Sequence, residues 1–547
     1  MQIKVSDYIA RRLLNLGIDH VFGLPGDFNF NILDSVIQAP GLTWVNCTNE
    51  LNAAYAADGY ARINGYGAVV TTFGVGELSA INGIAGAYAE NLPVIKIAGV
   101  PKTQAIKSGA LLHHNFSNPD YFAFEKVYSN VTAATAYLDN ENTIKSEIDR
   151  VFDIFIKEKK PVYIALPVDV CNFIVDDTIP ETIIKSDPVN LKNAADKITE
   201  LINNSKNPLI ITDYLMKRFR LQNEVRSIVE KFNIKITSMI MGKGLIEEDD
   251  RHFIGMNFGE VAEDDYKEVY QDFDLIIGFG TLFSDLNTLG FAVKPDERFK
   301  VEIQTDYVIA DGERFENVYI IDIINTLLNS NSLQSKNPPA SNIPYIGYKP
   351  SVPSDKPIVL DEVFPLLQDF LEENDTVIIE TGIISFASSK MKLKKGSNYL
   401  SQTLWGSIGW ATPAAFGASV ADKSKRTVLF TGEGSHQLTV QELSNMFKYD
   451  IKPVILVLNN SGYTIERYLS NDPNDVFNDI TNWNYKKALE LFGKHYKYHS
   501  VKTSNDLNRA LNAAKEEQKD NLVYIEIFAD KMDIPEIMKK SVAGVKK

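Results

Sequence analysis

Residues 427–435 read TVLFTGEGS, and residues 453–460 read PVILVLNN. Each stretch begins with a short run of apolar and β-branched residues, typical of a buried strand, and ends in small or polar residues. A helical pattern at residues 437–448 lies between them, so we expect a strand–helix–strand unit. Because the strands of such a unit are parallel, Gly434 and Asn459, which 24 residues separate, would end at the same edge of a sheet.

The residues at this edge favour a diphosphate bound together with a divalent cation. Gly432 and Gly434 allow a phosphate to approach the backbone closely at a helix N-terminus. Glu433 and Asn460 supply a carboxylate and an amide oxygen, which are hard ligands that suit Mg²⁺. A glycine turn or a polar loop would explain either half alone, whereas both halves at this spacing favour a ligand site.

Two proline-rich stretches divide the chain. Residues 176–190 contain two prolines, and residues 329–357 contain six among serine and asparagine. Proline at this density interrupts regular hydrogen bonding and indicates a boundary. We therefore predict three domains, at residues 1–182, 190–330 and 357–547.

Each predicted domain alternates short apolar runs with longer helical patterns. The expected strands are residues 67–72 and 94–99 in the first domain, 208–212, 235–238 and 275–280 in the second, and 376–380, 427–431 and 453–459 in the third. This alternation favours parallel sheets covered by helices on both faces. We expect an α/β protein of three doubly wound domains with mainly parallel sheets.

The first domain contributes a further set of conspicuous motifs. They are GLPGDFN at residues 23–29, NELNAAYAADGYAR at 49–62, TFGVGELS at 72–79 and HH at 113–114. Together with GEG and NN, they resemble the thiamine-diphosphate-dependent 2-oxo acid decarboxylases, which include pyruvate, indolepyruvate and branched-chain 2-oxo acid decarboxylases. The resemblance spans all three domains in order. One departure is Glu433, where the family's Gly-Asp-Gly motif has Asp.

The resemblance implies a thiamine-diphosphate-binding fold in the first and third domains, with thiamine diphosphate and Mg²⁺ as cofactors. Glu433, Asn460 and the carbonyl of Gly462 would hold Mg²⁺. The carbonyl of Gly406 would accept a hydrogen bond from the aminopyrimidine, and Ile408 would separate the two cofactor rings, although Ile408 alone fits a core residue. The other implied cofactor-binding positions are Thr381, Gly432, Gly434, Ser435, Tyr463, Thr464 and Ile465.

The candidate catalytic residues are acids and imidazoles. Glu50 would hold the pyrimidine ring nitrogen, although a carboxylate favoured by the dipole at a helix start is the simpler interpretation. Asp27, His114 and Glu466 would orient the substrate carboxylate and move protons, with His113 in support. Adjacent histidines cannot share one face of a helix or strand, which argues against a structural metal pair.

The expected substrate follows from a small side chain. Pyruvate-preferring family members place a bulky aromatic residue where this chain has Ser385. We place Ile465, Thr72 and Gln368 in the same pocket and expect the C-terminal tail to cap it. A wider pocket favours branched, longer-chain or aromatic 2-oxo acids, with pyruvate as the alternative.

Two other functions remain open at this stage. A carboligase of the acetohydroxyacid synthase type has a similar architecture, but the pair His113–His114 and the lack of a clear flavin motif in the middle domain argue against it. A catalytically silent family member is the second alternative, because Glu433 departs from the usual aspartate. Reconstitution with thiamine diphosphate and Mg²⁺ would distinguish this second alternative from an active enzyme.

Composition limits the partners. The formal net charge of −15 argues against nucleic acid or an anionic membrane surface as a partner. Two cysteines cannot form a disulfide framework, and no apolar run reaches the length of a membrane span, so we expect a cytoplasmic protein. The resemblance implies a homodimer or homotetramer with active sites between subunits and a small 2-oxo acid as the ligand.

Overall fold

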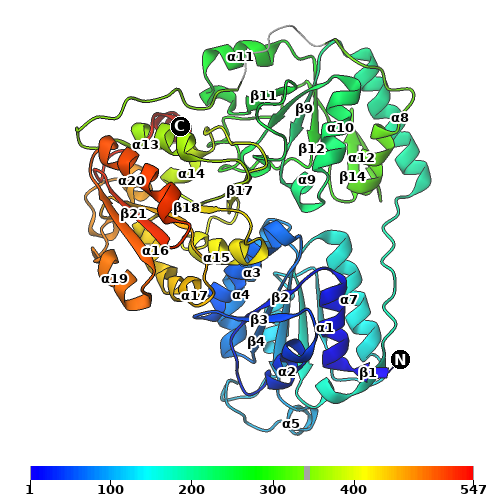
Figure 1. Cartoon of the computed structure of the whole chain (residues 1–547). Helices are drawn as coiled ribbons and strands as arrows, with labels where there is room; N and C mark the ends of the chain where they lie inside the picture. Colours follow the sequence, from blue (N-terminus) through cyan, green and yellow to red (C-terminus); the bar gives the residue numbers. More distant parts are fainter. Residues whose placement is uncertain (1, 338–344, 546–547) are drawn as a thin grey trace.

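The computed structural model describes residues 2–337 and 345–545, which form three large sheets flanked by helices (Figure 1). Each sheet lies within one of the segments that the proline-rich stretches delimit. No strand or helix occurs between Asp176 and Pro188, where the chain is extended, or between residues 345 and 356. Residues 338–344 of the second predicted linker lie outside the described residues.

The first sheet has six parallel strands in the order β3-β2-β4-β5-β7-β6. The strands are β2 (His20–Gly23), β3 (Thr43–Asn46), β4 (Gly67–Thr72), β5 (Val94–Val100), β6 (Ala134–Tyr137) and β7 (Val162–Pro167). The helices are α1 (Val5–Asn15), α2 (Phe30–Gln38), α3 (Glu50–Asn64), α4 (Val75–Ala89), α5 (Thr103–Ser108), α6 (Ala123–Tyr128) and α7 (Ile144–Glu158). The chain passes from β2 to β3 on one side and then crosses to β4 on the other side of β2, so the sheet has a switch point between β2 and β4.

The middle sheet has the order β11-β10-β9-β12-β13-β14-β15, and its last two strands are antiparallel to their neighbours. The strands are β9 (Pro208–Thr212), β10 (Lys235–Ser238), β11 (Phe253–Met256), β12 (Leu275–Phe279), β13 (Phe299–Ile303), β14 (Tyr307–Ala310) and β15 (Glu313–Glu316). The helices are α8 (Pro188–Asn204), α9 (Tyr214–Arg218), α10 (Gln222–Phe232), α11 (Asp264–Gln271) and α12 (Ile320–Leu328).

The third sheet is again six-stranded and parallel, in the order β17-β16-β18-β19-β21-β20. The strands are β16 (Thr376–Ile379), β17 (Asn398–Ser401), β18 (Thr427–Gly432), β19 (Val454–Asn459), β20 (Tyr496–Val501) and β21 (Leu522–Phe528). The helices are α13 (Leu360–Phe370), α14 (Ile383–Ser388), α15 (Ala411–Ala421), α16 (Glu433–Thr439), α17 (Leu443–Lys448), α18 (Thr464–Leu469), α19 (Tyr485–Phe492), α20 (Ser504–Glu517) and α21 (Glu536–Val545). Its strand order repeats that of the first sheet, with a switch point between β16 and β18.

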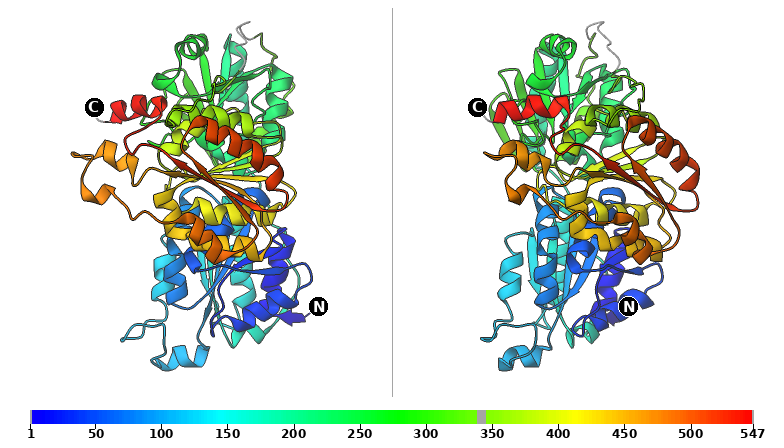
Figure 2. Two further views of the ribbon diagram at one scale, coloured as in Figure 1. Left: turned by 60° about the vertical axis from the view of Figure 1, so that its left-hand side comes forward. Right: turned by 90° about the vertical axis from the view of Figure 1, so that its left-hand side faces the viewer.

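The third sheet lies between the other two, as Figure 2 shows. Its central strands are buried on both faces, and their alternate residues join different apolar cores. On β19, Ile455 and Val457 belong to the core shared with the first sheet, whereas Val454 and Leu456 belong to the core shared with the middle sheet. This two-residue period is what a strand between two apolar layers requires, and it explains the unbroken apolar run of residues 453–458.

The fold class predicted from the sequence is confirmed, with small differences at some elements. The helical pattern at residues 437–448 is two helices, α16 and α17, separated by a 3-10 turn at Val440–Glu442. Before α1, the short strand β1 (Gln2–Lys4) pairs antiparallel with β8 (Ile174–Asp176). Among the described residues, no helix is long and apolar enough to cross a membrane.

Candidate active site

The carboxyl ends of β2, β3, β4 and β5 bring the first set of candidate residues to one edge of the first sheet. Asp27 follows β2, Glu50 begins α3 after β3, and Thr72 ends β4. His113 and His114 lie in the segment after β5 and α5. The site is built on loops because parallel strands end at the same edge and loops there can present side chains to a ligand.

Glu50 is positioned by the start of α3. Asn49 is the N-cap residue, and its side-chain oxygen accepts the N–H of Asn52 at 2.8 Å. Glu50 follows in the first turn and is half-buried. Gly76 faces it so closely that a Cβ at position 76 would lie 3.2 Å from Glu50 Oε1. The glycine therefore leaves room beside the carboxylate.

Thr72 has a buried hydroxyl without a partner. Its side chain is 8% exposed, and among the described residues Thr72 Oγ1 has no hydrogen-bond partner. It lies against Gly26, where a Cβ would approach Oγ1 to 2.8 Å. Since buried polar groups are normally satisfied, an orphaned hydroxyl beside glycines fits a bound ligand.

Asp27, His113 and His114 form a compact cluster. His113 Nε2 lies 3.0 Å from Asp27 Oδ2, and the two imidazole rings are 4.5 Å apart between centroids. One polar atom from each residue lies within 4.8 Å of the others, so the three could together ligate a metal ion. His114 has a positive φ of 66°, and its carbonyl oxygen would be 2.1 Å from a Cβ at Gly74. Gly74 therefore allows the histidine loop to pack against the start of α4.

A second set of candidate residues lies at the corresponding edge of the third sheet. Glu433 begins α16 and is only 2% exposed. Its Oε1 accepts the backbone N–H groups of Asn460 at 3.1 Å and Gly462 at 2.9 Å. The amide of Asn460 donates to Thr464 Oγ1 at 2.7 Å. The two halves of the sequence motif, at the ends of β18 and β19, are thus in direct contact.

Glu433 has no cationic partner in the part of the chain that the structure describes. Burial raises the pKa of its carboxyl to about 7, although the backbone N–H groups of Gly462, Asn460 and Ser461 oppose this rise. No ion pair within the described residues includes Glu433. A buried carboxylate without a counter-charge fits a metal ion. At Gly432, which precedes it, a Cβ would meet no atom within 4 Å, so the helix start is open.

The loop at residues 402–409 carries Gly406 and Ile408. Gly406 has a φ of 62°, and a Cβ there would meet no atom closer than 3.7 Å. Ile408 is 38% exposed, so it is not the core residue that its sequence alone would allow. Asn82 of α4 contacts both neighbours of Gly406: its Oδ1 accepts Trp405 Nε1–H at 2.9 Å, and its Nδ2 donates to Ser407 Oγ at 3.1 Å.

The substrate-pocket candidates separate in the structure. Ser385 is half-buried on α14, where its hydroxyl donates to the carbonyl of Gly382 at 2.8 Å. Gln368 lies on α13, where its Oε1 accepts the N–H groups of Tyr348 and Lys392 and so joins α13 to both segments. These two bonds engage its buried oxygen with backbone, and its place in the pocket stays a prediction.

The remaining candidates cluster with Glu433. Ser435 and Thr464 are buried, Tyr463 and Ile465 are half-buried, and Glu466 is exposed on the first turn of α18. A Cβ at Gly434 would lie 2.5 Å from the ring of Tyr463, so these two positions pack tightly. The tail helix α21 packs against α14, the helix of Ser385.

Sequence reasoning missed Glu380, which is 1% exposed at the end of β16. Its Oε1 accepts the N–H of Thr381 at 3.1 Å, and Oε2 accepts that of Gly409 at 3.3 Å. Burial raises the pKa of Glu380 to about 7. It joins Thr381 to the Gly406 loop, and the available sequence signal was an acidic residue at the end of the predicted strand at residues 376–380.

Three family models match the chain in order. They are the N-terminal TPP binding domain of thiamine pyrophosphate enzymes at residues 3–124, their central domain at 195–329 and their C-terminal TPP binding domain at 380–527. Pyruvate decarboxylase isozyme 3 of Saccharomyces cerevisiae is 37% identical over 98% of both chains. Pyruvate decarboxylase of Kluyveromyces lactis is 35% identical over 98% of this chain and 97% of its own. This chain belongs to the thiamine-diphosphate-dependent 2-oxo acid decarboxylases.

Membership of this decarboxylase family confirms three predictions. The chain is a carboxy-lyase, it binds thiamine diphosphate, and its first and third sheets are the two thiamine-diphosphate-binding domains. The middle sheet of the decarboxylase corresponds to the family's central domain. The repeated strand order of the first and third sheets accords with their shared cofactor.

Proposed function

We propose that the substrate of this decarboxylase is pyruvate, which loses CO₂ to give acetaldehyde. The observation that supports pyruvate is the similarity, over nearly the whole length of both chains, to relatives named pyruvate decarboxylases. The sequence favoured larger 2-oxo acids, and these relatives favour the alternative. Ser385 remains the specific observation for a larger substrate, because a half-buried serine leaves space that a bulky aromatic residue would fill.

A substrate panel tests this proposal. The protein is loaded with thiamine diphosphate and Mg²⁺, and kcat/KM for aldehyde formation is measured with pyruvate, 4-methyl-2-oxopentanoate, phenylpyruvate and indolepyruvate. We expect the largest value for pyruvate. A larger value for any of the other three acids would contradict the proposal and support the second candidate. A Ser385→Phe variant, compared with Ser385→Ala, would show whether bulk at this position shifts the preference.

Mg²⁺ is the proposed counter-ion of Glu433. The buried carboxylate, the side-chain oxygen of Asn460 and the carbonyl of Gly462 are oxygen donors of the kind that Mg²⁺ prefers. Glutamate is one methylene longer than the family's aspartate, and in this chain its Oε1 accepts two backbone N–H groups. To test the site, Mg²⁺ is titrated into the protein in the presence of thiamine diphosphate, and the quenching of protein fluorescence is followed. The unaltered protein should give a saturable Mg²⁺ curve, and Glu433→Gln should not.

Glu50 is the proposed partner of the cofactor's pyrimidine nitrogen. Bound thiamine diphosphate supplies the electron-accepting ring that makes loss of CO₂ feasible. Glu50 would hold a proton at that nitrogen, and the absence of a side chain at Gly76 keeps its carboxylate from being crowded. Glu50→Gln should lower kcat by about 10²-fold or more while cofactor binding stays within a few-fold. Near-normal turnover of this variant would remove the assignment.

Asp27, His113, His114 and Glu466 are the proposed residues for binding the substrate carboxylate and moving protons. The first three already form one cluster. Imidazole and carboxylate side chains serve as general acids and bases, and imidazole N–H groups can also orient an anion. We prefer this role to a metal site because Asp27 and His113 are each about half exposed, at 49% and 55%.

We propose that two chains complete each active site. Within the described residues, no hydrogen bond or ion pair joins the Asp27–Glu50 cluster to the Glu433 cluster. Both clusters are bordered by exposed apolar side chains, which a second copy would cover. Those near the first cluster are Phe30, Val75, Leu111 and Phe116, and those near the second are Ile408, Leu438, Val476 and Phe477. A homodimer, alone or paired into a homotetramer, follows from this arrangement.

A further inference from the structure

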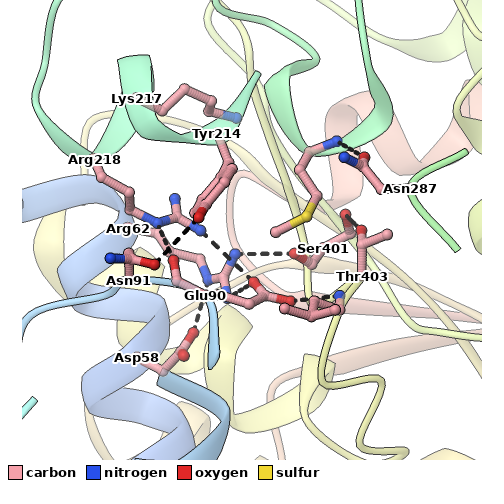
Figure 3. Close-up of polar contacts among 12 residues, drawn as sticks. Asp58, Arg62, Glu90, Asn91, Tyr214, Lys217, Arg218, Asn287, Ser401 and Thr403 are labelled. Atoms are coloured by element: carbon pink, nitrogen blue, oxygen red, sulfur yellow. Dashed lines mark hydrogen bonds and ion pairs between the residues drawn. The ribbon is translucent and has the colours of Figure 1, made fainter. Parts of the chain in front are cut away.

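A buried glutamate in the third sheet has no cation beside it. Glu526 lies on β21 and is 3% exposed. Elsewhere in the chain, the buried carboxylates Asp58 and Glu90 are both paired with Arg62 (Figure 3). Glu526 forms no ion pair in the part of the chain that the structure describes, and its two oxygens accept hydrogen bonds from neutral groups instead. A buried carboxylate of this kind depends on those hydrogen bonds.

Both hydrogen bonds of Glu526 are short. Its Oε1 accepts a hydrogen bond from Asn459 Nδ2 at 2.6 Å, and its Oε2 accepts one from the hydroxyl of Tyr498 on β20 at 2.5 Å. Strand register explains the first contact, because Val457 of β19 pairs with Glu526, and Asn459, two residues further along, points to the same face. A carboxylate can accept from both donors at once, whereas an amide has only one acceptor oxygen.

Asn459 is also held to this part of the sheet through its backbone. Its carbonyl accepts the N–H of Ala529, which follows β21, at 3.1 Å. The same peptide group presents the N–H of Asn460, which donates to Glu433 Oε1 at 3.1 Å. One peptide group therefore connects the end of β21 to the buried carboxylate of Glu433, and a rotation of this group would disturb both contacts.

The turn after β19 is anchored to the same region. The amide of Asn460 donates to Thr464 Oγ1 at 2.7 Å, and this hydroxyl donates to the carbonyl of Lys531 at 3.0 Å. The turn that carries two of the proposed Mg²⁺ ligands is thus fixed from β21 and the residues after it. The bond between Asn459 and Glu526 is the shortest of these contacts with β21 and its continuation.

We propose that Glu526 is a positioning residue for the Mg²⁺ site, because it orients Asn459 and thereby the peptide group that binds Glu433. The inference rests on the Mg²⁺ site proposed above. Glu526 is not one of the ligands, since its two oxygens are engaged by Asn459 and Tyr498. Removal of a side chain that holds a metal ligand in place commonly lowers metal affinity by about 10- to 100-fold.

The Mg²⁺ titration described above, followed by fluorescence quenching at saturating thiamine diphosphate, tests this role. Glu526→Leu should raise the Mg²⁺ concentration at half-saturation by about 10- to 100-fold, because the turn loses its anchor. Glu526→Gln keeps an acceptor oxygen for Asn459 and should recover most of the affinity. Tyr498→Phe is the matched control: it removes the other bond of the same carboxylate, so it should lower Tm and leave the half-saturation unchanged.

A second variant breaks the same bond from its other side. Asn459→Leu should raise the half-saturation concentration as Glu526→Leu does, and it keeps the test decisive if Glu526→Leu does not fold. The two substitutions together should raise it by less than the product of their separate effects, because both remove one bond.

The outcomes that would overturn the proposal are distinct. An unchanged half-saturation in Glu526→Leu or Asn459→Leu would show that this bond does not position the turn. An equal rise in Tyr498→Phe would indicate a general loss of stability, and an equal rise in Glu526→Gln would indicate an effect of charge. If the unaltered protein gives no saturable Mg²⁺ curve, the Mg²⁺ site itself is rejected, and the role of Glu526 with it.

Discussion

At the scale of single residues, the polar groups of Thr72 and Asn82 should contribute more to catalysis than to the stability of the fold. The hydroxyl of Thr72 is buried and unpartnered, so the folded chain bears the cost of desolvating it. The amide of Asn82 is exposed but bonds to both neighbours of Gly406. A bound ligand would give the Thr72 hydroxyl a partner, and Asn82 would position the loop that contacts this ligand.

Thr72→Val should leave the free energy of unfolding unchanged or raise it by about 1 kcal/mol, because it removes an unsatisfied buried hydroxyl. The same substitution should lower kcat/KM by about tenfold, since one hydrogen bond to the bound ligand is lost. Chemical denaturation and steady-state kinetics measure the two effects. Thr71→Val is the matched control: Thr71 Oγ1 accepts from Lys96 at 2.8 Å, so its loss should destabilise the fold. A destabilised Thr72→Val protein would contradict the assignment.

Asn82→Leu should lower kcat by about 10- to 100-fold, because the loop on both sides of Gly406 loses its hydrogen bonds and the carbonyl shifts. Unfolding stability should change by no more than about 1 kcal/mol, since the side chain is exposed. Asn82→Asp keeps the acceptor for Trp405 and should recover part of the rate. Equal rates for Asn82→Leu and the unaltered enzyme would show that these bonds do not position the loop.

At the scale of elements, strands were predicted well and contacts between segments were not. The runs at residues 67–72, 208–212 and 235–238 are strands with the predicted bounds, because apolar β-branched runs between breakers carry a strong local signal. The helix at residues 437–448 breaks at Glu442. Its Oε2 accepts hydrogen bonds from Thr48 Oγ1 and Asn52 Nδ2 of the first segment. No local sequence pattern predicts this tertiary contact.

The candidate site shows the same division. The motifs located Glu50, Glu433 and Asn460 because glycines and polar residues follow apolar runs at fixed spacing. Glu380 was missed, and the backbone bonds of Gln368 were not foreseen, since only the folded chain shows which buried side chains bond to backbone. Which residues lie side by side in a site depends on strand order, which the sequence does not determine.

The end of β9 in the middle sheet gives a pH-dependent prediction. Burial raises the pKa of Asp213 to about 7, although hydrogen bonds from Leu282 and Asn287 oppose the rise. The folded chain therefore binds a proton between about pH 4 and 7 that the unfolded chain has released, so stability from this group falls as pH rises through that window. Asp213→Asn should reduce the loss of unfolding free energy over this pH range.

Urea denaturation of Asp213→Asn at a series of pH values between 4 and 8 measures the effect. The variant should gain stability relative to the unaltered protein as pH rises, by on the order of a few kcal/mol at pH 8. Asp274→Asn is the opposite control, because hydrogen bonds from Ser205 and the backbone lower the pKa of Asp274. A parallel pH profile for Asp213→Asn and the unaltered protein would refute the proposed protonation.

At the scale of the whole molecule, one chain carries both the Asp27–Glu50 cluster and the Glu433 cluster, and no hydrogen bond or ion pair among its described residues joins them. Helices α3 and α15 pack the first and third segments together, with Tyr55 OH bonded to Ser407. This packing fixes the positions of the two sheet edges, one at the start of α3 with Glu50 and the other at the start of α16 with Glu433. In a two-fold dimer each edge of one chain can meet the other edge of its partner, which yields two equivalent sites.

Mixed dimers of Glu50→Gln and Glu433→Ala test this arrangement. If each site takes Glu50 from one chain and Glu433 from the other, a mixed dimer has one site with both defects and one site with neither. Co-expression of the two inactive variants in equal amounts should then restore about one-quarter of normal activity, because half of the dimers are mixed and each has one intact site.

The two variants must each be inactive alone, and differently tagged chains allow the mixed dimer to be purified before its rate is measured. The purified mixed dimer should then show about half of normal turnover per dimer. A site built within one chain predicts the opposite result, since every site of a mixed dimer would retain one defect. Activity no higher than that of the single variants would therefore place Glu50 and Glu433 of the same chain in one site and exclude the shared arrangement.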